Sequence, residues 1–175
     1  MNQTIMRKIL IALFCAAALF AADVVRRAPG FSIVDSKGVE HDLADYRGKL
    51  VLLVFTQSTC PHCAGFADVL QQTQQKYGSR VAVLAVVNPP DEPGKVSAFI
   101  TDHHLTYPIL FDSGQVAYSY VQSGTITFPH LYMIDGSGMI RRDFVYGQQD
   151  HDVFEGDQLA AEINRLLPAG APDRK

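Results

Sequence analysis

The sequence predicts an α/β protein with a central mixed β-sheet flanked by helices and with an N-terminal β-hairpin. Short, continuously apolar runs at residues 50–55 and 81–87 are typical of strands that are covered on both faces. Each run leads into a segment with helical character, and a strand–helix–strand–helix order favours right-handed crossovers within one sheet. With 175 residues, the chain has room for one domain, which we place at residues 23–168.

The first 22 residues differ from the rest of the chain. Arg7 and Lys8 precede the apolar stretch 9–22, a pattern typical of a secretory signal peptide. An uncleaved N-terminal membrane anchor is the alternative, because no cleavage site stands out. Without residues 1–22 the chain keeps 13 basic and 18 acidic residues, a net charge of about −5 that favours solubility and argues against nucleic-acid binding. We therefore expect an exported protein of the periplasm or cell envelope.

The first elements of the domain lead directly to a pair of cysteines. Residues 31–41 alternate around a turn and predict the hairpin. The strand at 50–55 ends five residues before Cys60, and apolar residues then recur at helical spacing as far as Tyr77. Gly78 follows, where a glycine commonly ends a helix. Cys60 is therefore expected to open a helix.

The second half of the chain continues the same alternation. The strand at 81–87 ends in a cluster of prolines, after which we expect a helix at 95–104. Asp112 and Gln115 predict a capping box for a short helix that ends at Tyr120.

The C-terminal part of the chain predicts a second hairpin and a last helix. Strands at 130–135 and 139–146 flank the turn Gly136–Gly138. A helix at 159–167 follows, and residues 169–175 form a polar tail.

The motif Cys60-Pro61-His62-Cys63 has the features of a redox couple. Backbone amides at a helix start favour negative charge, so the Cys60 thiolate should be stabilised. Pro61 suits the first helical position, and Cys63, almost one turn further on, is close enough to form a disulfide. His62 adds a donor or a positive charge beside the thiolate, which raises the reduction potential. We expect Cys60 to be the attacking sulfur and Cys63 the resolving one.

Other uses of the two cysteines are less well supported. A zinc site would need a second cysteine pair, which the chain lacks once Cys15 in the expected signal is set aside. A Cu(I)-binding module built from Cys60, Cys63 and a histidine remains an alternative. A purely structural disulfide would close too short a loop to constrain the unfolded chain much.

Several segments occur together in this order: residues 28–31 with Asp35, Gly38 and Leu43, residues 48–55, residues 60–63, and Pro129 with Asp135 and Gly138. Taken together, they resemble the thioredoxin superfamily, and most closely its exported TlpA-like branch. The resemblance implies a thioredoxin-like fold and a thiol-disulfide oxidoreductase that uses no cofactor or metal. It also implies protein thiols and disulfides as substrates, with a possible membrane-bound redox partner. Pro129 is implied to be a cis-proline that, with Phe128, presents backbone to a substrate strand.

The chain also departs from that family. Thr59 stands where many TlpA-like reductases have tryptophan, and Phe66 stands where they have an acid. Val54 replaces the buried aspartate of thioredoxin, so no carboxylate is placed to take the proton of Cys63. The Pro-His spacer resembles that of DsbA-type oxidants, which favours a couple more oxidising than thioredoxin, whereas the TlpA-like resemblance suggests a reductant. A peroxiredoxin-like peroxidase is a further alternative, although Gln57 stands where its motif has threonine.

Overall fold

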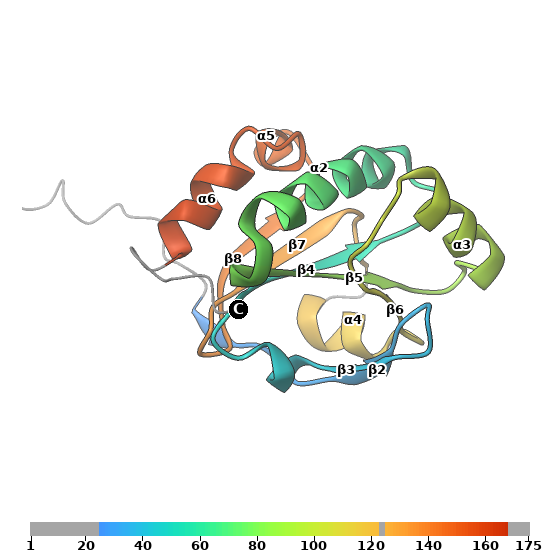
Figure 1. Ribbon diagram of the computed structural model, residues 1–175, viewed down its shortest axis with the longest axis horizontal. Coiled ribbons are helices and arrows are strands. Elements are labelled where there is room, and N and C mark those ends of the chain that lie inside the picture. Colours follow the sequence, from blue (N-terminus) through green and yellow to red (C-terminus); the bar gives the residue numbers. More distant parts are fainter. Residues whose placement is uncertain (1–24, 123–124, 168–175) are drawn as a thin grey trace, which may run out of the picture.

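The computed structural model describes residues 25–122 and 125–167. The expected signal segment at 1–22 and the polar tail at 169–175 lie outside the described residues. The main sheet has the strand order β1 (Arg26–Arg27), β8 (Met139–Val145), β7 (His130–Ile134), β4 (Leu50–Thr56), β5 (Val81–Val87) and β6 (Ile109–Phe111). The helices are α2 (Pro61–Tyr77), α3 (Pro93–Asp102), α4 (Gln115–Val121), α5 (His151–Phe154) and α6 (Leu159–Leu166) (Figure 1).

The sheet is mixed, as predicted. β4 pairs in parallel with β5, and β5 pairs in parallel with β6. β7 runs antiparallel to both β4 and β8, and β1 runs antiparallel to β8. The expected N-terminal hairpin forms a separate two-stranded sheet of β2 (Ser32–Val34) and β3 (Glu40–Asp42). These pairings confirm the fold class and put β4, which leads to Cys60, near the middle of the main sheet.

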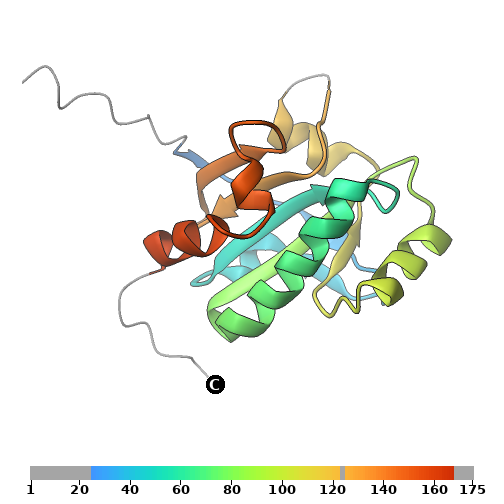
Figure 2. The ribbon, with the colours of Figure 1, turned by 90° about the horizontal axis from the view of Figure 1, so that it is seen from above.

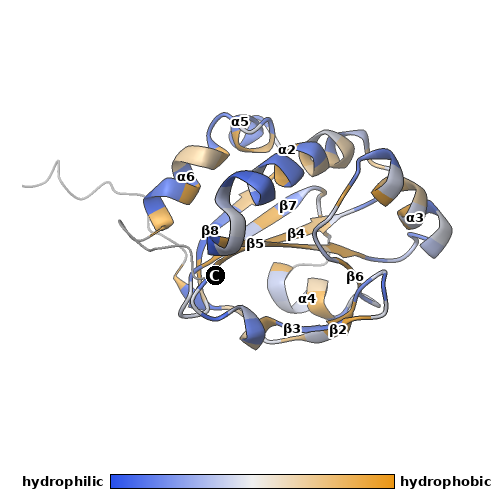
Figure 3. Cartoon of the chain, in the orientation of Figure 1, coloured by the Kyte–Doolittle hydropathy of each residue, from blue (hydrophilic) through white to orange (hydrophobic). Residues whose placement is uncertain are grey.

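Helices cover the sheet unequally on its two faces. α2, α3, α5 and α6 lie over one face, whereas α4 and the β2–β3 hairpin lie over the other (Figure 1). Seen from above, α2 crosses the sheet with α3 on one side and α5 and α6 on the other (Figure 2). Every residue of β4 and β5 is buried, and the hydrophobic colour of these strands contrasts with the mixed colour of the helices (Figure 3). Burial on both faces explains why these strands have continuously apolar sequences.

Side chains of β4 alternate between two hydrophobic cores. Leu52 and Val54 pack toward the α2 face, together with Phe66 of α2. Leu53 and Phe55 pack toward α4. The position of a residue along β4 therefore decides whether it approaches the helix that carries the cysteines.

Two helix starts differ from the sequence prediction. α3 begins at Pro93 rather than residue 95, because proline at a first helical position loses no hydrogen bond. The expected capping box does not form at α4, whose N-cap is Gly114. Asp112 instead accepts hydrogen bonds from the backbone N–H groups of Val116 (3.2 Å) and Ala117 (2.9 Å). The aspartate thus caps the helix from two positions before the N-cap.

The turn between β7 and β8 is organised by one carboxylate. Asp135 accepts hydrogen bonds from the backbone N–H groups of Ser137 (2.9 Å) and Met139 (3.0 Å), and from Arg141 Nε (2.6 Å). Although burial opposes ionisation, the bonds to Ser137, Met139 and Arg141 lower the pKa of Asp135 from 3.8 to about 2.

Asp135→Asn is expected to lower the free energy of unfolding near neutral pH. The ionised carboxylate stabilises the fold above its unfolded pKa of 3.8, and this contribution is lost as the pH falls through about 2. The difference in the free energy of unfolding between wild type and variant should therefore become smaller as the pH falls from 3.8 to about 2. Urea unfolding midpoints of both proteins, measured at a series of pH values, would test this. A difference between the midpoints that does not change with pH would contradict it.

Candidate active site

Cys60 stands at the start of α2. It is the N-cap residue, with extended backbone (φ −91°, ψ 118°), and Pro61 occupies the first turn. The backbone N–H of Cys63 donates a hydrogen bond to the Cys60 sulfur (3.4 Å). Cys60 is half-buried, whereas Pro61 and His62 are exposed. The sulfur that the sequence predicts to attack therefore lies at a helix start, where a partner can reach it.

Cys63 lies beneath the first turn and is only 1% exposed. Both cysteines are free thiols in the structure. Burial is the main cause that raises the pKa of Cys63 to about 12, and the hydrogen bond to Cys60 raises it further. Contacts with the Thr56 side chain and the Gln57 backbone act in the opposite direction. Cys63 therefore remains a thiol at neutral pH, and it is far less accessible than the half-buried Cys60.

A small cavity of about 10 Å³ lies behind Cys63. Such a volume is about what one water molecule needs. Val54, the residue at the position of the thioredoxin aspartate, lines this cavity, and none of the residues around it is acidic. The full lining is Val54, Thr56, Cys63, Phe66, Ala67, Leu70, Ala85, Phe99 and Tyr107.

The loop before Cys60 is held by a carboxylate that the sequence analysis did not single out. Asp91 accepts a hydrogen bond from the backbone N–H of Ser58 (2.8 Å) and another from the Ser58 hydroxyl. Asp91 follows a cis peptide bond between Pro89 and Pro90. In the sequence this region is only a turn-forming cluster, because the contact depends on β4 and β5 ending side by side.

The Phe128–Pro129 peptide bond is cis, as the family resemblance implied. Its neighbour His130 pairs with Phe55 near the end of β4, so Pro129 lies beside the strand end that leads into the cysteine motif. Pro129 is buried and Phe128 is half-buried. The carbonyl of Pro129 accepts a hydrogen bond from the Tyr146 N–H (3.1 Å), which joins this segment to the end of β8.

The two histidines closest in sequence to these features have different surroundings. The His62 ring stacks on Tyr146, with ring centroids 4.2 Å apart. His130 Nε2 lies 2.6 Å from a carboxylate oxygen of Asp143. Within residues 25–122 and 125–167, no three His, Cys, Asp or Glu side chains gather as metal ligands would. The Cu(I) alternative therefore finds no ready third ligand in this part of the chain.

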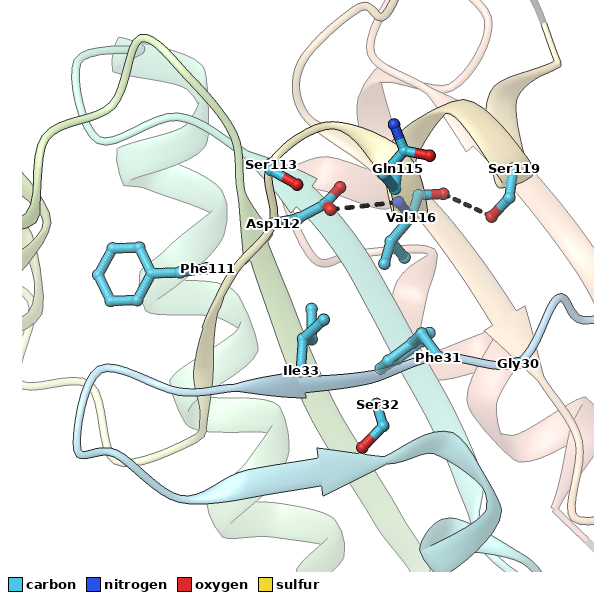
Figure 4. A pocket seen from close by; sticks show the side chains of 10 residues that line it. All are labelled: Gly30, Phe31, Ser32, Ile33, Phe111, Asp112, Ser113, Gln115, Val116 and Ser119. Carbon is cyan, nitrogen blue, oxygen red and sulfur yellow. Dashed lines mark hydrogen bonds between the residues drawn. The ribbon is translucent and has the colours of Figure 1, made fainter.

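A wider groove of about 420 Å³ lies on the opposite face of the sheet. Phe31 and Ile33 of the hairpin segment face Val116 of α4 across it (Figure 4). Ser119 and Asp112 form hydrogen bonds with the backbone of Val116 here, so these polar groups are already used within the fold. None of the residues predicted for the site lines this groove.

Comparisons with known proteins find relatives of this chain. The AhpC/TSA family model matches residues 24–143. The thiol-disulfide oxidoreductase ResA of Geobacillus kaustophilus (strain HTA426) is 30% identical over 152 residues, which cover 87% of this chain and 80% of that protein. The thioredoxin-like protein YneN of Bacillus subtilis (strain 168) is 30% identical over 118 residues, covering 66% and 68% of the two chains.

A solved structure shares the architecture. The protein, from Chlorobium tepidum, is described as a thiol:disulfide interchange protein, DsbE. It superimposes with a TM-score of 0.67 at 27% sequence identity, covering 81% of this chain and 99% of that one. The match supports a thioredoxin-like fold with helices on both faces of a mixed sheet.

Proposed function

Because this chain belongs to the AhpC/TSA family and is a thiol-disulfide oxidoreductase homologous to ResA, we propose that Cys60 and Cys63 are its redox couple and that it acts on proteins of the bacterial cell envelope. The observation that carries the proposal is the contrast between the two sulfur atoms. Cys60 is half-buried at a helix start, whereas Cys63 is 1% exposed and its pKa is raised to about 12.

The proposed thiol-disulfide exchange proceeds in two steps. The Cys60 thiolate attacks a partner disulfide, so that a Cys60–partner bond forms and the other partner sulfur leaves as a thiolate. Cys63 then gives up its proton and attacks the Cys60 sulfur, releasing the second partner thiolate. The partner gains two electrons, and the protein ends with a Cys60–Cys63 disulfide. The same steps in reverse oxidise a dithiol.

The segment Phe128–Pro129 supplies the proposed docking edge. Since Pro129 adjoins the end of β4, an extended partner segment placed along this backbone would bring its sulfur toward Cys60. The carbonyl of Pro129 already accepts the Tyr146 N–H, so the partner would use the remaining polar groups of the segment.

For localisation, we propose export to the cell envelope on the basis of residues 1–22. Arg7 and Lys8 followed by an apolar stretch are typical of a secretory signal. No helix within residues 25–122 and 125–167 is long and apolar enough to cross a bilayer. A membrane-bound redox partner that resets the couple after each turnover belongs to the same proposal.

For direction, we propose a couple more oxidising than thioredoxin, whose potential is about −270 mV. His62 lies in the first turn of α2, where its imidazole can favour the reduced form. Val54 and Phe66 are buried apolar residues, so neither contributes a negative charge near the two cysteines. Both features raise the potential.

Equilibration with glutathione tests function and direction together. The wild-type chain should interconvert between dithiol and disulfide forms and should reduce or oxidise a synthetic disulfide peptide, whereas Cys60→Ser should do neither. The midpoint of the glutathione titration gives the potential, which should lie above that of thioredoxin. Tight Cu(I) binding, or rapid reduction of hydrogen peroxide, without peptide exchange would contradict the proposal and favour one of the alternatives.

A further inference from the structure

The imidazole of His62 has a defined partner on another element. Its ring stacks on Tyr146, with centroids 4.2 Å apart and planes 24° from parallel. His62 is exposed in the first turn of α2, and Tyr146 directly follows β8. An exposed histidine with no neighbour would sample several rotamers, whereas this stack favours one of them.

Tyr146 is itself held in place from two sides. Its backbone N–H donates to the carbonyl of Pro129 (3.1 Å). Its ring meets Phe154 in an edge-on contact at 5.6 Å, and Phe154 packs in the same way on Phe66 of α2 at 4.8 Å. The Tyr146 ring, on which His62 stacks, is thus anchored both to the cis-proline segment and to the core beneath α2.

The ring face of Tyr146 also suits a positively charged imidazole. An aromatic face is electron-rich and attracts a cation that lies over it, so the Tyr146 ring can hold the imidazole in its charged form as well as in its neutral form. Because His62 lies within the Cys60–Cys63 motif, we expect the stack on Tyr146 to affect the Cys60 thiolate of the reduced protein.

We propose that Tyr146 is a positioning residue for the redox couple: it holds the His62 imidazole at the start of α2, on the Pro129 side of the motif, so that this imidazole favours the reduced form. The inference rests on the proposed function of Cys60 and Cys63. It adds that the potential depends on a residue far away in the sequence. Tyr146 touches no reacting atom, and its influence passes through His62.

A double-mutant cycle on the full chain separates this role from general support of the fold. The glutathione equilibrium would be measured for wild type, Tyr146→Leu, Tyr146→Phe, His62→Ala and the His62→Ala/Tyr146→Leu double variant. Tyr146→Leu should favour the disulfide form by about three- to tenfold, the upper end corresponding to a potential about 30 mV lower. Tyr146→Phe keeps the ring and should match wild type. The double variant should match His62→Ala alone.

Tyr118→Leu is the matched control, because Tyr118 is 71% exposed on α4 at the opposite face of the sheet. It should leave the equilibrium unchanged. If Tyr146→Leu does not fold, proton NMR of the wild type keeps the proposal testable, since a stacked His62 ring should show signals shifted upfield that persist in Tyr146→Phe. Absence of that shift would overturn the inference.

The outcomes also distinguish this inference from the proposed function. Normal exchange with no change in Tyr146→Leu, or an equal change with and without His62, would overturn the positioning role alone. A wild-type chain that does not equilibrate with glutathione would overturn the proposed function, and the inference with it.

Discussion

Replacing Cys63 with alanine is expected to convert the protein from a catalyst into a trap for its partner. Cys60 can still attack a partner disulfide, but no second thiol can displace the partner from the Cys60 sulfur. Turnover of a disulfide peptide should fall to background, and the mixed disulfide should accumulate to nearly stoichiometric amounts. Non-reducing gels and intact-mass measurement would detect a species that a reductant reverses.

Cys60→Ala is the matched control for this trap. Cys63 is 1% exposed, so the protein that keeps only this sulfur should capture almost nothing. Capture by the Cys60→Ala variant and not by Cys63→Ala would reverse the assigned roles. Expressed in cells, the Cys63→Ala variant should also retain the natural partner, whose compartment would test the proposed export.

Local sequence patterns were sufficient to predict the elements that carry the two cysteines. The apolar run of β4 followed by helical spacing placed Cys60 at the start of α2, and the structure shows it as the N-cap. Pro61 and Gly78 mark the two ends of this helix through properties that belong to single residues. Such signals need no knowledge of the rest of the fold.

Contacts between distant segments could not be read in the same way. The stack of His62 on Tyr146 depends on β8 ending beside the start of α2, and the Asp91–Ser58 bonds depend on two neighbouring loops. Short elements were missed for another reason: the three residues of β6 and the four of α5 are too few to show a period.

The resolving step, in which Cys63 attacks the mixed disulfide at Cys60, is expected to become about tenfold faster for each unit by which the pH rises near neutrality. Burial is the main cause that raises the pKa of Cys63 to about 12, and we expect it to keep this pKa far above neutrality when Cys60 is joined to a partner. Since the raised pKa lies far above neutral pH, the thiolate fraction of Cys63 grows in proportion to hydroxide throughout this range. Single-turnover release of a peptide from the mixed disulfide should therefore rise with a logarithmic slope near one and show no plateau between about pH 6 and pH 9.

Val54→Asp should flatten this profile by supplying the missing proton acceptor. Val54 lines the cavity beside Cys63, and aspartate is close to valine in size, so its carboxylate would lie next to the thiol. Burial would raise the pKa of the new carboxyl toward neutrality, where general bases act best, and release at neutral pH should accelerate about 10²-fold.

Val54→Asn is the control that separates the effect of a proton acceptor from the effect of placing a polar side chain at this position. Both variants bury a polar group and should lower the free energy of unfolding by about 1–3 kcal/mol, so circular dichroism must first show that each is folded. The amide cannot accept the Cys63 proton, so Val54→Asn should keep the slope near one. Equal rates and slopes in the two variants would mean that deprotonation of Cys63 does not limit release. The barrier would then lie in the approach of the Cys63 sulfur, which is buried beneath the first turn of α2, to the disulfide at Cys60.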